Sequence, residues 1–134
     1  MTTRLNPYIN FDGDARQALE FYRSVFGGEL SVMTFGDMGN PDTTVNGRVM
    51  HGQLETTAGY TLMCSDIMPG MPFVPGTTIT VSLSGDEAEE LRGYWDRLAE
   101  GGTVTVTLEK QVWGAEFGQL TDRFGVAWMV NIGQ

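Results

Sequence analysis

The sequence predicts an α+β protein of two βαβββ modules in tandem, each a curved mixed sheet with a helix on its outer face. Two internal repeats support this prediction. The block at residues 13–22 shares Gly, Asp, Leu and Tyr with residues 85–94, at a constant spacing of 72. The tripeptide Gly-Gln-Leu at 52–54 occurs again at 118–120, 66 residues later. Because order, polarity and spacing all recur, we expect one structural unit used twice.

The module boundaries follow from composition. Module one is predicted at 1–68 and module two at 78–134, and the two together form one domain. The linker at 69–77 contains three prolines and two glycines, which interrupt helices and strands. A chain of 134 residues can bury enough of its surface on folding to form one compact domain.

Module one is predicted to contain a strand at 5–11, a helix at 15–26, a β-rich stretch at 30–35 and a hairpin of strands 49–55 and 60–65. Apolar residues three and four apart give the helix one buried stripe. Asp14 stands where an N-cap carboxylate would accept hydrogen bonds from the first-turn amides. Gly27 and Gly28 follow the last turn, where a left-handed residue is favoured.

Module two repeats this order, with a strand at 78–83, a helix at 87–100, a β-rich stretch at 103–108 and a hairpin of strands 116–121 and 126–132. Asp86 is the expected N-cap of the second helix, and Gly101 and Gly102 mark its expected end. The hairpin turns end in Gly59 and Gly125, where a positive φ has no steric cost.

Alternation along the strands predicts which sheet face each helix covers. The apolar sets are Pro7, Ile9 and Phe11; Ile79, Val81 and Leu83; and Trp128, Val130 and Ile132. Cys64 alternates with Met63 and is predicted on the covered side, as a small buried residue rather than a reactive thiol. His51, Gln53 and Glu55 share the opposite face of their strand. That face is small, polar or mixed, so it is either a concave binding surface or a face open to water.

The charge balance limits the partners. The formal net charge is −9, which disfavours nucleic acid and anionic membrane surfaces because both need clustered Lys and Arg. An acidic surface is compatible with a cationic ligand and, more simply, with solubility. No apolar run approaches the ~20 residues of a membrane helix, and the first residues lack the apolar core of a signal peptide. With the single cysteine Cys64, we expect a cytoplasmic protein without disulfides.

Two motifs connect the chain with a known group of proteins. The first is Asn-Pro-Tyr-Ile-Asn-Phe-Asp-Gly at 6–13, followed by Ala-Leu-Glu-Phe-Tyr at 18–22 and Phe-Gly-Gly at 26–28. The second is Trp-Gly at 113–114, followed by Phe-Gly-Gln-Leu-Thr-Asp-Arg-Phe-Gly-Val-Ala-Trp at 117–128. With these motifs, the whole chain resembles the PhnB-like branch of the vicinal-oxygen-chelate superfamily (glyoxalase, bleomycin-resistance and dioxygenase proteins). The resemblance implies the glyoxalase/bleomycin-resistance fold but no single function, because that scaffold hosts several chemistries and binding roles.

The resemblance also implies where a metal would bind. Metal-using members place ligands on the first and last strands of each module, and these positions fall on or near Asn6, Met63, Thr78 and Met129. None is His, Asp or Glu, the residue types that hold hard or borderline divalent metals. We therefore expect no cofactor and no standard metal site, although His51 and Glu55 leave a makeshift divalent site open.

The residues predicted to line the binding face are Asn6, Tyr8, Asn10, His51, Gln53, Glu55, Met63, Thr78, Trp113 and Met129. No catalytic residue is assigned among them. General acid–base chemistry is available to Glu55, Glu116, Asp37 or Tyr8. Some members of the branch carry the name of a demethylubiquinone methyltransferase, but the Gly-rich strand-to-helix turn expected for a nucleotide or methyl donor is missing.

Three functions are compatible with this scaffold. The first is a metal-free protein that binds a small organic molecule, like the resistance proteins that sequester a drug between two subunits. The alternative is an enzyme of the superfamily (a lyase, isomerase or transferase) with a non-standard or metal-free site. The third is a structural or regulatory dimer whose cleft is vestigial. In each case we expect a homodimer, because pairing covers the edges and concave faces of the sheets.

Overall fold

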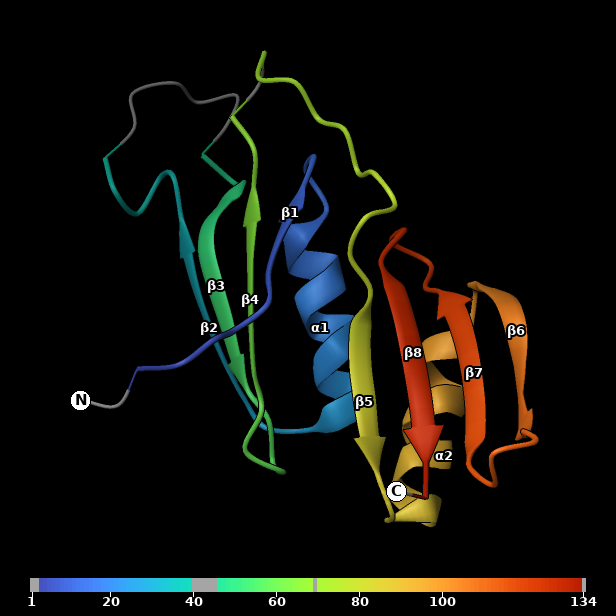
Figure 1. The fold of residues 1–134 in the computed structure, drawn as a ribbon. Helices are drawn as coiled ribbons and strands as arrows, with labels where there is room; N and C mark the ends of the chain where they lie inside the picture. Colours follow the sequence, from blue (N-terminus) through green and yellow to red (C-terminus); the bar gives the residue numbers. More distant parts are fainter. Residues whose placement is uncertain (1–2, 40–45, 69, 134) are drawn as a thin grey trace. The chain divides into compact units, whose positions relative to one another are not determined.

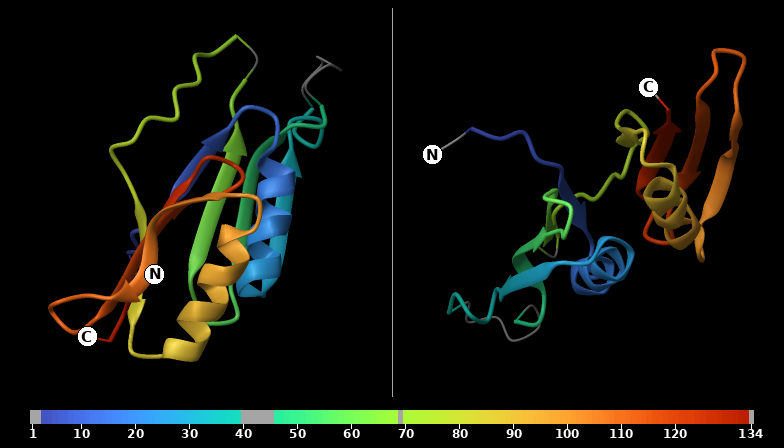
Figure 2. Two further views of the ribbon diagram at one scale, coloured as in Figure 1. Left: turned by 90° about the vertical axis from the view of Figure 1, so that its right-hand side faces the viewer. Right: turned by 90° about the horizontal axis from the view of Figure 1, so that it is seen from below.

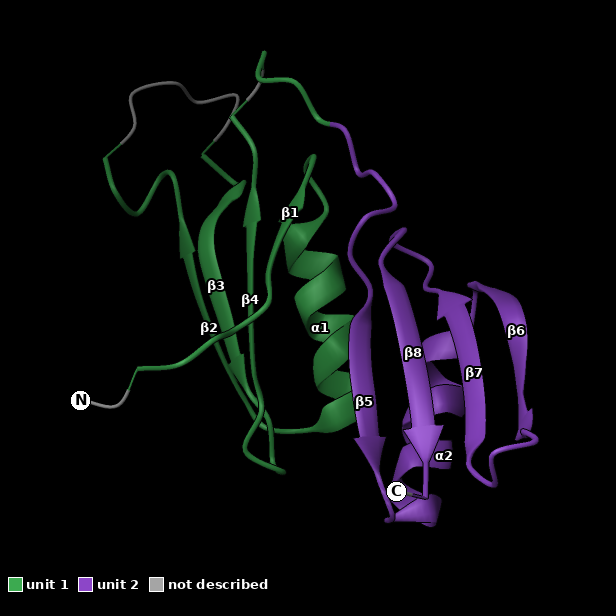
Figure 3. Ribbon diagram, in the orientation of Figure 1, with its two compact units in different colours: residues 1–73 green, residues 74–134 purple. Residues whose placement is uncertain are grey.

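The computed structural model describes residues 3–39, 46–68 and 70–133. The chain divides into two compact units, Met1–Phe73 and Val74–Gln134 (Figure 3). Their boundary falls inside the predicted linker, of which Pro69 lies outside the described residues. Within the described ranges each unit contains one helix and one four-stranded sheet. The α+β class with two tandem modules is therefore confirmed.

Unit one runs β1 (Tyr8–Phe11), α1 (Ala15–Phe26), β2 (Glu29–Thr34), β3 (Val49–Glu55) and β4 (Thr61–Asp66). Its sheet has the order β1-β4-β3-β2 (Figure 1). β1 lies parallel to β4, whereas β3 is antiparallel to both of its neighbours. The sheet is therefore mixed, and the first and last strands of the unit lie side by side.

Unit two runs β5 (Val81–Gly85), α2 (Ala88–Ala99), β6 (Thr103–Lys110), β7 (Glu116–Thr121) and β8 (Ala127–Ile132). Its sheet has the order β5-β8-β7-β6, with β5 parallel to β8 and β7 antiparallel to both neighbours. This is the topology of unit one, strand for strand. The edge strand β6 pairs with two register shifts.

Each helix packs on one face of the sheet in its own unit (Figure 2). The side chains buried on α1 are Ala15, Ala18, Leu19, Tyr22, Val25 and Phe26, and those on α2 are Leu91, Tyr94, Trp95 and Leu98. They meet buried strand residues, among them Leu54 and Cys64 in unit one and Trp128 and Val130 in unit two. Each large side chain buried in this way contributes about 1.5–3 kcal/mol. Among the described residues, no helix is both long and apolar enough to cross a bilayer.

The repeated Gly-Gln-Leu motif marks the point where each helix presses on its sheet. A Cβ added at Gly52 would lie 2.2 Å from Leu19 Cδ1 of α1. A Cβ added at Gly118 would lie 2.7 Å from the Trp95 ring of α2 and 2.8 Å from Leu108 Cα. Glycine therefore leaves room for one large helix side chain to reach the strand.

The Gly-Gly pairs combine two requirements. Gly27 and Gly101 have φ values of +73° and +75°, as predicted for the ends of the helices. At the second glycine of each pair, an added Cβ would lie 2.0 Å from the Glu55 carbonyl oxygen or 2.4 Å from that of Thr121. The chain therefore turns at the first glycine and passes directly against the hairpin backbone at the second.

The prediction that Asp14 and Asp86 cap the helices through their side chains is wrong. Neither helix has a side-chain cap hydrogen bond at its N-cap residue, which is Asp14 for α1 and Glu87 for α2. In α1 the carboxylate comes instead from Asp66, whose Oδ1 accepts the N–H groups of Gly13 at 2.8 Å and Ala15 at 3.0 Å. Because β4 runs parallel to β1, its end lies beside the turn where the helix begins.

Both first strands begin later than predicted, β1 at Tyr8 rather than Leu5 and β5 at Val81 rather than Thr78. The residue before β1 is proline, which has no N–H for a ladder. Ile79, predicted beneath α2, precedes β5 and is 83% exposed. Leu83 is buried as predicted.

Candidate functional site

The face of the unit-one sheet that α1 leaves uncovered carries a line of polar side chains. The register places Tyr8 of β1, Met63 of β4, Gln53 of β3 and Ser31 of β2 in one row across the sheet. The buried residues Leu54, Leu62 and Cys64 alternate with them and point toward α1. Since neighbouring side chains of a strand point to opposite faces, His51, Gln53 and Glu55 share the uncovered face.

Tyr8 and His51 are in contact with each other in this line of polar side chains. The Tyr8 hydroxyl lies 3.1 Å from His51 Nδ1, and the two ring centroids are 5.6 Å apart. Met33 of β2 is paired with His51 in the register. The side chains of Tyr8 and Met33 are 48% and 42% exposed, so an aromatic ring and a thioether adjoin the imidazole at the surface.

Gln53 connects His51 with Glu55. His51 Nε2 lies 3.4 Å from Gln53 Oε1, and Gln53 Nε2 donates to Glu55 Oε1. The hydroxyl of Thr61 donates to Glu55 Oε2 at 2.8 Å and accepts from Arg4 at 3.4 Å. Tyr8, His51, Gln53, Glu55 and Thr61 are called the polar row below.

The direction of each hydrogen bond in the polar row follows from Glu55. An ionised carboxylate only accepts, so Gln53 turns its NH₂ toward Glu55 and its carbonyl oxygen toward His51. His51 Nε2 then carries the proton, and in the neutral ring Nδ1 is an acceptor. When the ring is neutral, the Tyr8 hydroxyl therefore donates to Nδ1. Donation runs from Tyr8 toward the carboxylate.

Hydrogen bonds also set the charge state of Glu55. Donation by Thr61, and then by Gln53, lowers the pKa of the Glu55 carboxyl below its ordinary value. Partial desolvation opposes this effect, and the nearby Arg4 guanidinium adds to it. Glu55 is therefore a carboxylate at neutral pH, as the direction of the hydrogen bonds requires.

The corresponding face of unit two lacks this chemistry. Its register places Ser82 of β5, Met129 of β8, Gln119 of β7 and Val106 of β6 in one row. The glutamine and the methionine recur, but serine stands where unit one has Tyr8. The residues two before and two after Gln119 are Phe117 and Thr121, in place of His51 and Glu55. The described part of unit two therefore has no counterpart of the Tyr–His–Glu set.

The other predicted face residues are placed as follows. Asn10 is exposed and pairs with Ser65 in the register, while Asn6 precedes β1 and is half-buried. Thr78 also precedes its strand and is exposed. Trp113, in the turn between β6 and β7, is 64% exposed, with its ring centroid 6.3 Å from that of Phe117. The structure thus brings together Tyr8, His51, Gln53, Glu55 and Met63, and places Thr78, Trp113 and Met129 in unit two.

The strand register pairs the two predicted methionines, Met63 and Met129, with residues other than Asn6 and Thr78. The register places Tyr8, not Asn6, opposite Met63, and Ser82, not Thr78, opposite Met129. The first strands are therefore offset by 74 residues, although the sequence repeat at the helix starts is 72. Between the first strand and the helix, unit one has three residues (12–14) and unit two has two (86–87), so this turn is one residue shorter in unit two.

These strand pairs do not fit a divalent metal. Tyr8 with Met63 and Ser82 with Met129 offer hydroxyls and thioethers, whereas such metals need imidazole or carboxylate ligands. Over residues 3–39, 46–68 and 70–133, no three His, Cys, Asp or Glu side chains are grouped so that they could hold a metal ion. His51 and Glu55 are instead separated by the Gln53 amide, which bonds to both.

Two other acids considered for proton transfer have local partners. Glu116 forms an ion pair with Arg92. Asp37 lies in the turn after β2, where the backbone N–H of Thr34 donates to its carboxylate at 2.9 Å and lowers its pKa. Neither belongs to the polar row.

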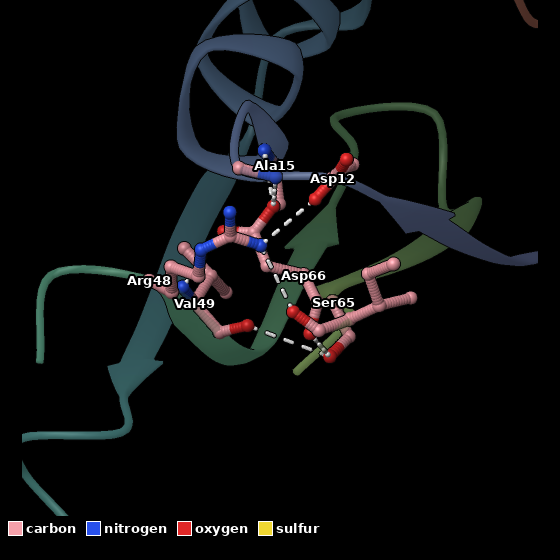
Figure 4. A network of polar contacts seen from close by, with 8 residues as sticks. Asp12, Ala15, Arg48, Val49, Ser65 and Asp66 are labelled. Carbon is pink, nitrogen blue, oxygen red and sulfur yellow. Dashed lines mark hydrogen bonds and ion pairs between the residues drawn. The ribbon is translucent and has the colours of Figure 1, made fainter. Parts of the chain in front are cut away.

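Asp66 has a structural role that no sequence motif marks. Its Oδ2 accepts the N–H of Val49 at 2.9 Å, while Oδ1 caps the start of α1 (Figure 4). Beside it, Arg48 donates to Asp12 at 3.1 Å and to the Ile67 carbonyl at 3.0 Å. In the sequence, Asp66 can be recognised only as a carboxylate at the end of an apolar strand. The structure adds that this strand runs parallel to β1, the strand before the helix. Since Asp66 is 3% exposed, this network joins elements rather than presenting a ligand site.

Comparison with known proteins places these observations in a family. A sequence model of the family described as 3-demethylubiquinone-9 3-methyltransferase matches residues 3–131. Protein YjdN of Escherichia coli (strain K12) is 31% identical over 145 residues, which span 96% of this chain and 94% of that protein.

Solved structures agree. Protein PA1353 from Pseudomonas aeruginosa superposes with a TM-score of 0.88 at 37% identity, over 99% of both chains. A PhnB protein from Bacillus cereus has a TM-score of 0.74 at 25% identity, over 98% of this chain and 100% of its own. A glyoxylase/bleomycin resistance protein/dioxygenase domain from Frankia sp. EAN1pec, at 16% identity, shares the fold with a TM-score of 0.67.

Proposed function

The chain belongs to the family described as 3-demethylubiquinone-9 3-methyltransferase, a PhnB-like branch of the glyoxalase/bleomycin-resistance/dioxygenase superfamily, and from that premise we propose that it binds a small organic molecule. The binding surface in this proposal is the uncovered face of the unit-one sheet, and its contacts come from the polar row. The ligand is held without a divalent metal.

The polar row is the observation that supports this proposal. Hydrogen bonds between exposed side chains contribute little to stability, because water competes for them and the side chains lose rotamer freedom. Unit two forms the same sheet with Ser82, Phe117 and Thr121 at the corresponding positions. The fold itself therefore does not require the tyrosine, histidine and glutamate of unit one, and recognition of a ligand gives them a role.

We do not extend the proposal to the methyl transfer named in the family description. A nucleotide or methyl donor is typically held at a Gly-rich turn between a parallel strand and a helix. Each sheet described here joins one parallel and two antiparallel strand pairs. The Gly-x-Gly-x-x-Gly pattern is missing from both strand-to-helix turns.

A second candidate is an enzyme of the superfamily, and the Tyr8–His51 contact favours it. The phenol and the imidazole are hydrogen bonded at 3.1 Å at the surface, so a proton can pass between them and a bound molecule. Gln53 and Glu55 would then act as positioning residues, because they orient the imidazole. Turnover that is lost in Tyr8→Phe while ligand affinity is retained would favour this candidate over a binding protein.

The proposal also takes the protein to be a homodimer in the cytoplasm. Dimerisation would cover sheet edges such as β6, which pairs only on its β7 side within the described residues. The single cysteine, Cys64, is buried beneath α1. Since one cysteine cannot form a disulfide within the chain, the proposal is compatible with a reducing compartment. Sedimentation velocity of the untagged protein tests the first statement.

A ligand screen with a matched pair of variants tests the proposal. A library of small organic molecules is first screened by thermal melting, since a ligand at about tenfold over its Kd raises the free energy of unfolding by about 1.4 kcal/mol. The affinity of each hit is then measured for Gln53→Leu and Gln119→Leu. The two glutamines occupy corresponding positions beside Met63 and Met129.

We expect Gln53→Leu to weaken binding by about tenfold or more, because it interrupts the polar row, and Gln119→Leu to leave the affinity unchanged. Equal losses in both variants would contradict the assignment to unit one. A library without a single hit would favour a structural or regulatory protein whose cleft is vestigial.

A further inference from the structure

The hydrogen-bond direction of the polar row determines what it offers a ligand. With the imidazole neutral, the Tyr8 hydroxyl donates to His51 Nδ1, so the phenolic oxygen presents lone pairs to the outside. At the other end, each Glu55 oxygen accepts one hydrogen bond within the row and can accept another. Tyr8 and Glu55 are therefore both acceptors toward a ligand. The remaining N–H of Gln53 is a neutral donor between them and is too weak to hold an anion beside a carboxylate.

Within the described part of the chain, two carboxylates and one guanidinium lie at the Glu55 end of the row. Glu29 of β2 is directly opposite Glu55 of β3 in the antiparallel register, on the same uncovered face. Like charges directly opposite each other across strands are destabilising. The guanidinium of Arg4 donates to the Thr61 hydroxyl, and its charge also lowers the pKa of Glu55, so Arg4 offsets part of the negative charge at this end. The chain as a whole has a net charge of −9, which attracts cations over a distance.

The surfaces beside the acceptors suit a cation with an organic body. The half-exposed Tyr8 ring can lie against a positive group through its π face. Met63 is paired with Tyr8 and Met33 with His51, so a thioether adjoins each ring on the sheet. Methionine side chains adapt to irregular apolar shapes and contact aromatic groups favourably.

From these features, and resting on the proposed function, we propose that the ligand of the polar row is an organic cation with N–H donors. Amidinium, guanidinium and protonated amine groups on an aromatic or short aliphatic body have this chemistry. The N–H groups donate to the Tyr8 oxygen and the Glu55 carboxylate, and the body lies over Tyr8, Met33 and Met63.

Three probes of nearly equal shape and different charge test this proposal: benzamidine, which is a cation, benzamide, which is neutral, and benzoate, which is an anion. Their dissociation constants are measured near neutral pH by following the ring signals of His51, the one histidine of the chain. We expect benzamidine to bind about tenfold more tightly than benzamide, the ratio for one charge-assisted hydrogen bond, and benzoate to bind most weakly.

Two glutamate variants separate a local contact from the general acidity of the protein. Glu55→Gln should bring the affinity of benzamidine to within about twofold of that of benzamide measured in the same variant, because the charge-assisted contact is removed. Glu109→Gln is the matched control, since Glu109 is exposed on β6 of unit two and its removal changes the net charge equally. It should leave all three affinities unchanged.

The outcomes distinguish this inference from the proposed function. If benzamide or benzoate binds as tightly as benzamidine, or if Glu109→Gln acts like Glu55→Gln, the ligand is not selected by a local cationic contact and the inference is overturned. It is also overturned if no probe moves the His51 signals while a library molecule does. In these cases the proposed function stands. If no library molecule binds at all, both fail.

Discussion

At the scale of single residues, one carboxylate that cannot donate sets the state of its neighbours. Glu55 orients the Gln53 amide, and that amide orients the His51 ring. We expect the neutral imidazole to carry its proton on Nε2. Long-range ¹H–¹⁵N correlation on the single histidine reads the tautomer directly. An Nδ1-protonated ring in the wild type would contradict the direction derived for the row, and Gln53→Leu should relax the preference.

Glu55 also predicts a pH dependence of stability. Because the folded protein holds the pKa of Glu55 below its unfolded value near 4.5, the carboxylate stabilises the fold above that pH. The contribution is lost as the pH falls through the lower, folded pKa. Wild type should therefore melt slightly above Glu55→Gln at neutral pH, and the difference should vanish in acid. A difference independent of pH, or an equal one for Glu109→Gln, would argue against this origin.

The largest single-residue effect on stability is expected at Asp66. In Asp66→Asn the NH₂ group replaces an acceptor that faces backbone N–H groups, which places donor against donor. We expect a loss of about 3 kcal/mol in the free energy of unfolding, measured by urea denaturation. The control is Asp12→Asn at the exposed Arg48 ion pair, where about 1 kcal/mol or less is expected. Equal losses in the two variants would mean that the hydrogen bonds of Asp66 contribute no more to the free energy of unfolding than the exposed ion pair does.

At the scale of elements, the glycine of the Gly-Gln-Leu motif sets how closely each helix packs. In Gly118→Ala the new methyl meets a rigid Trp95 ring and the backbone of Leu108. We expect a loss of about 2 kcal/mol, because neither neighbour can move freely. Gly47→Ala, where nothing lies within 4 Å, should change stability by less than about 0.5 kcal/mol. If urea denaturation shows that Gly118→Ala does not lower the free energy of unfolding, the close packing of α2 against Gly118 is contradicted.

The elements also divide into those the sequence could predict and those it could not. Helices and hairpin strands were predicted within a residue or two, because buried stripes, alternation and terminal glycines are local signals. The beginnings of β1 and β5 were missed, since Pro7 and the long linker decide them. Asp66 was missed for another reason: its role as a helix cap depends on the parallel pairing of β4 with β1, which brings residues 51 apart into contact.

The candidate site follows the same division. Alternation placed His51, Gln53 and Glu55 on one face, and Tyr8 on the corresponding face of its strand. That Tyr8 would meet His51 could not be read, because β1 and β3 are not neighbours and the contact crosses β4. The pairing of Tyr8 with Met63 could not be read either, because the sequence repeat gives the spacing of the helices and not the register of the strands.

At the scale of the whole molecule, the two units share a topology and differ in chemistry. Among the described residues, both units keep a glutamine and a methionine on the uncovered face, but only unit one surrounds them with Tyr8, His51 and Glu55. One scaffold can carry different sites, so a shared topology is compatible with two faces of different chemistry. The acidity of the chain then favours cationic ligands in solution.

The central claim, that the uncovered face of unit one binds the ligand, is tested most directly by NMR on His51. Because the chain has one histidine, its ring signals report on the polar row without ambiguity. A molecule that raises the melting temperature should shift these signals, and the Kd from the shifts should equal the Kd from calorimetry. A molecule that binds stoichiometrically while the His51 signals stay unchanged would contradict the account and place the site elsewhere.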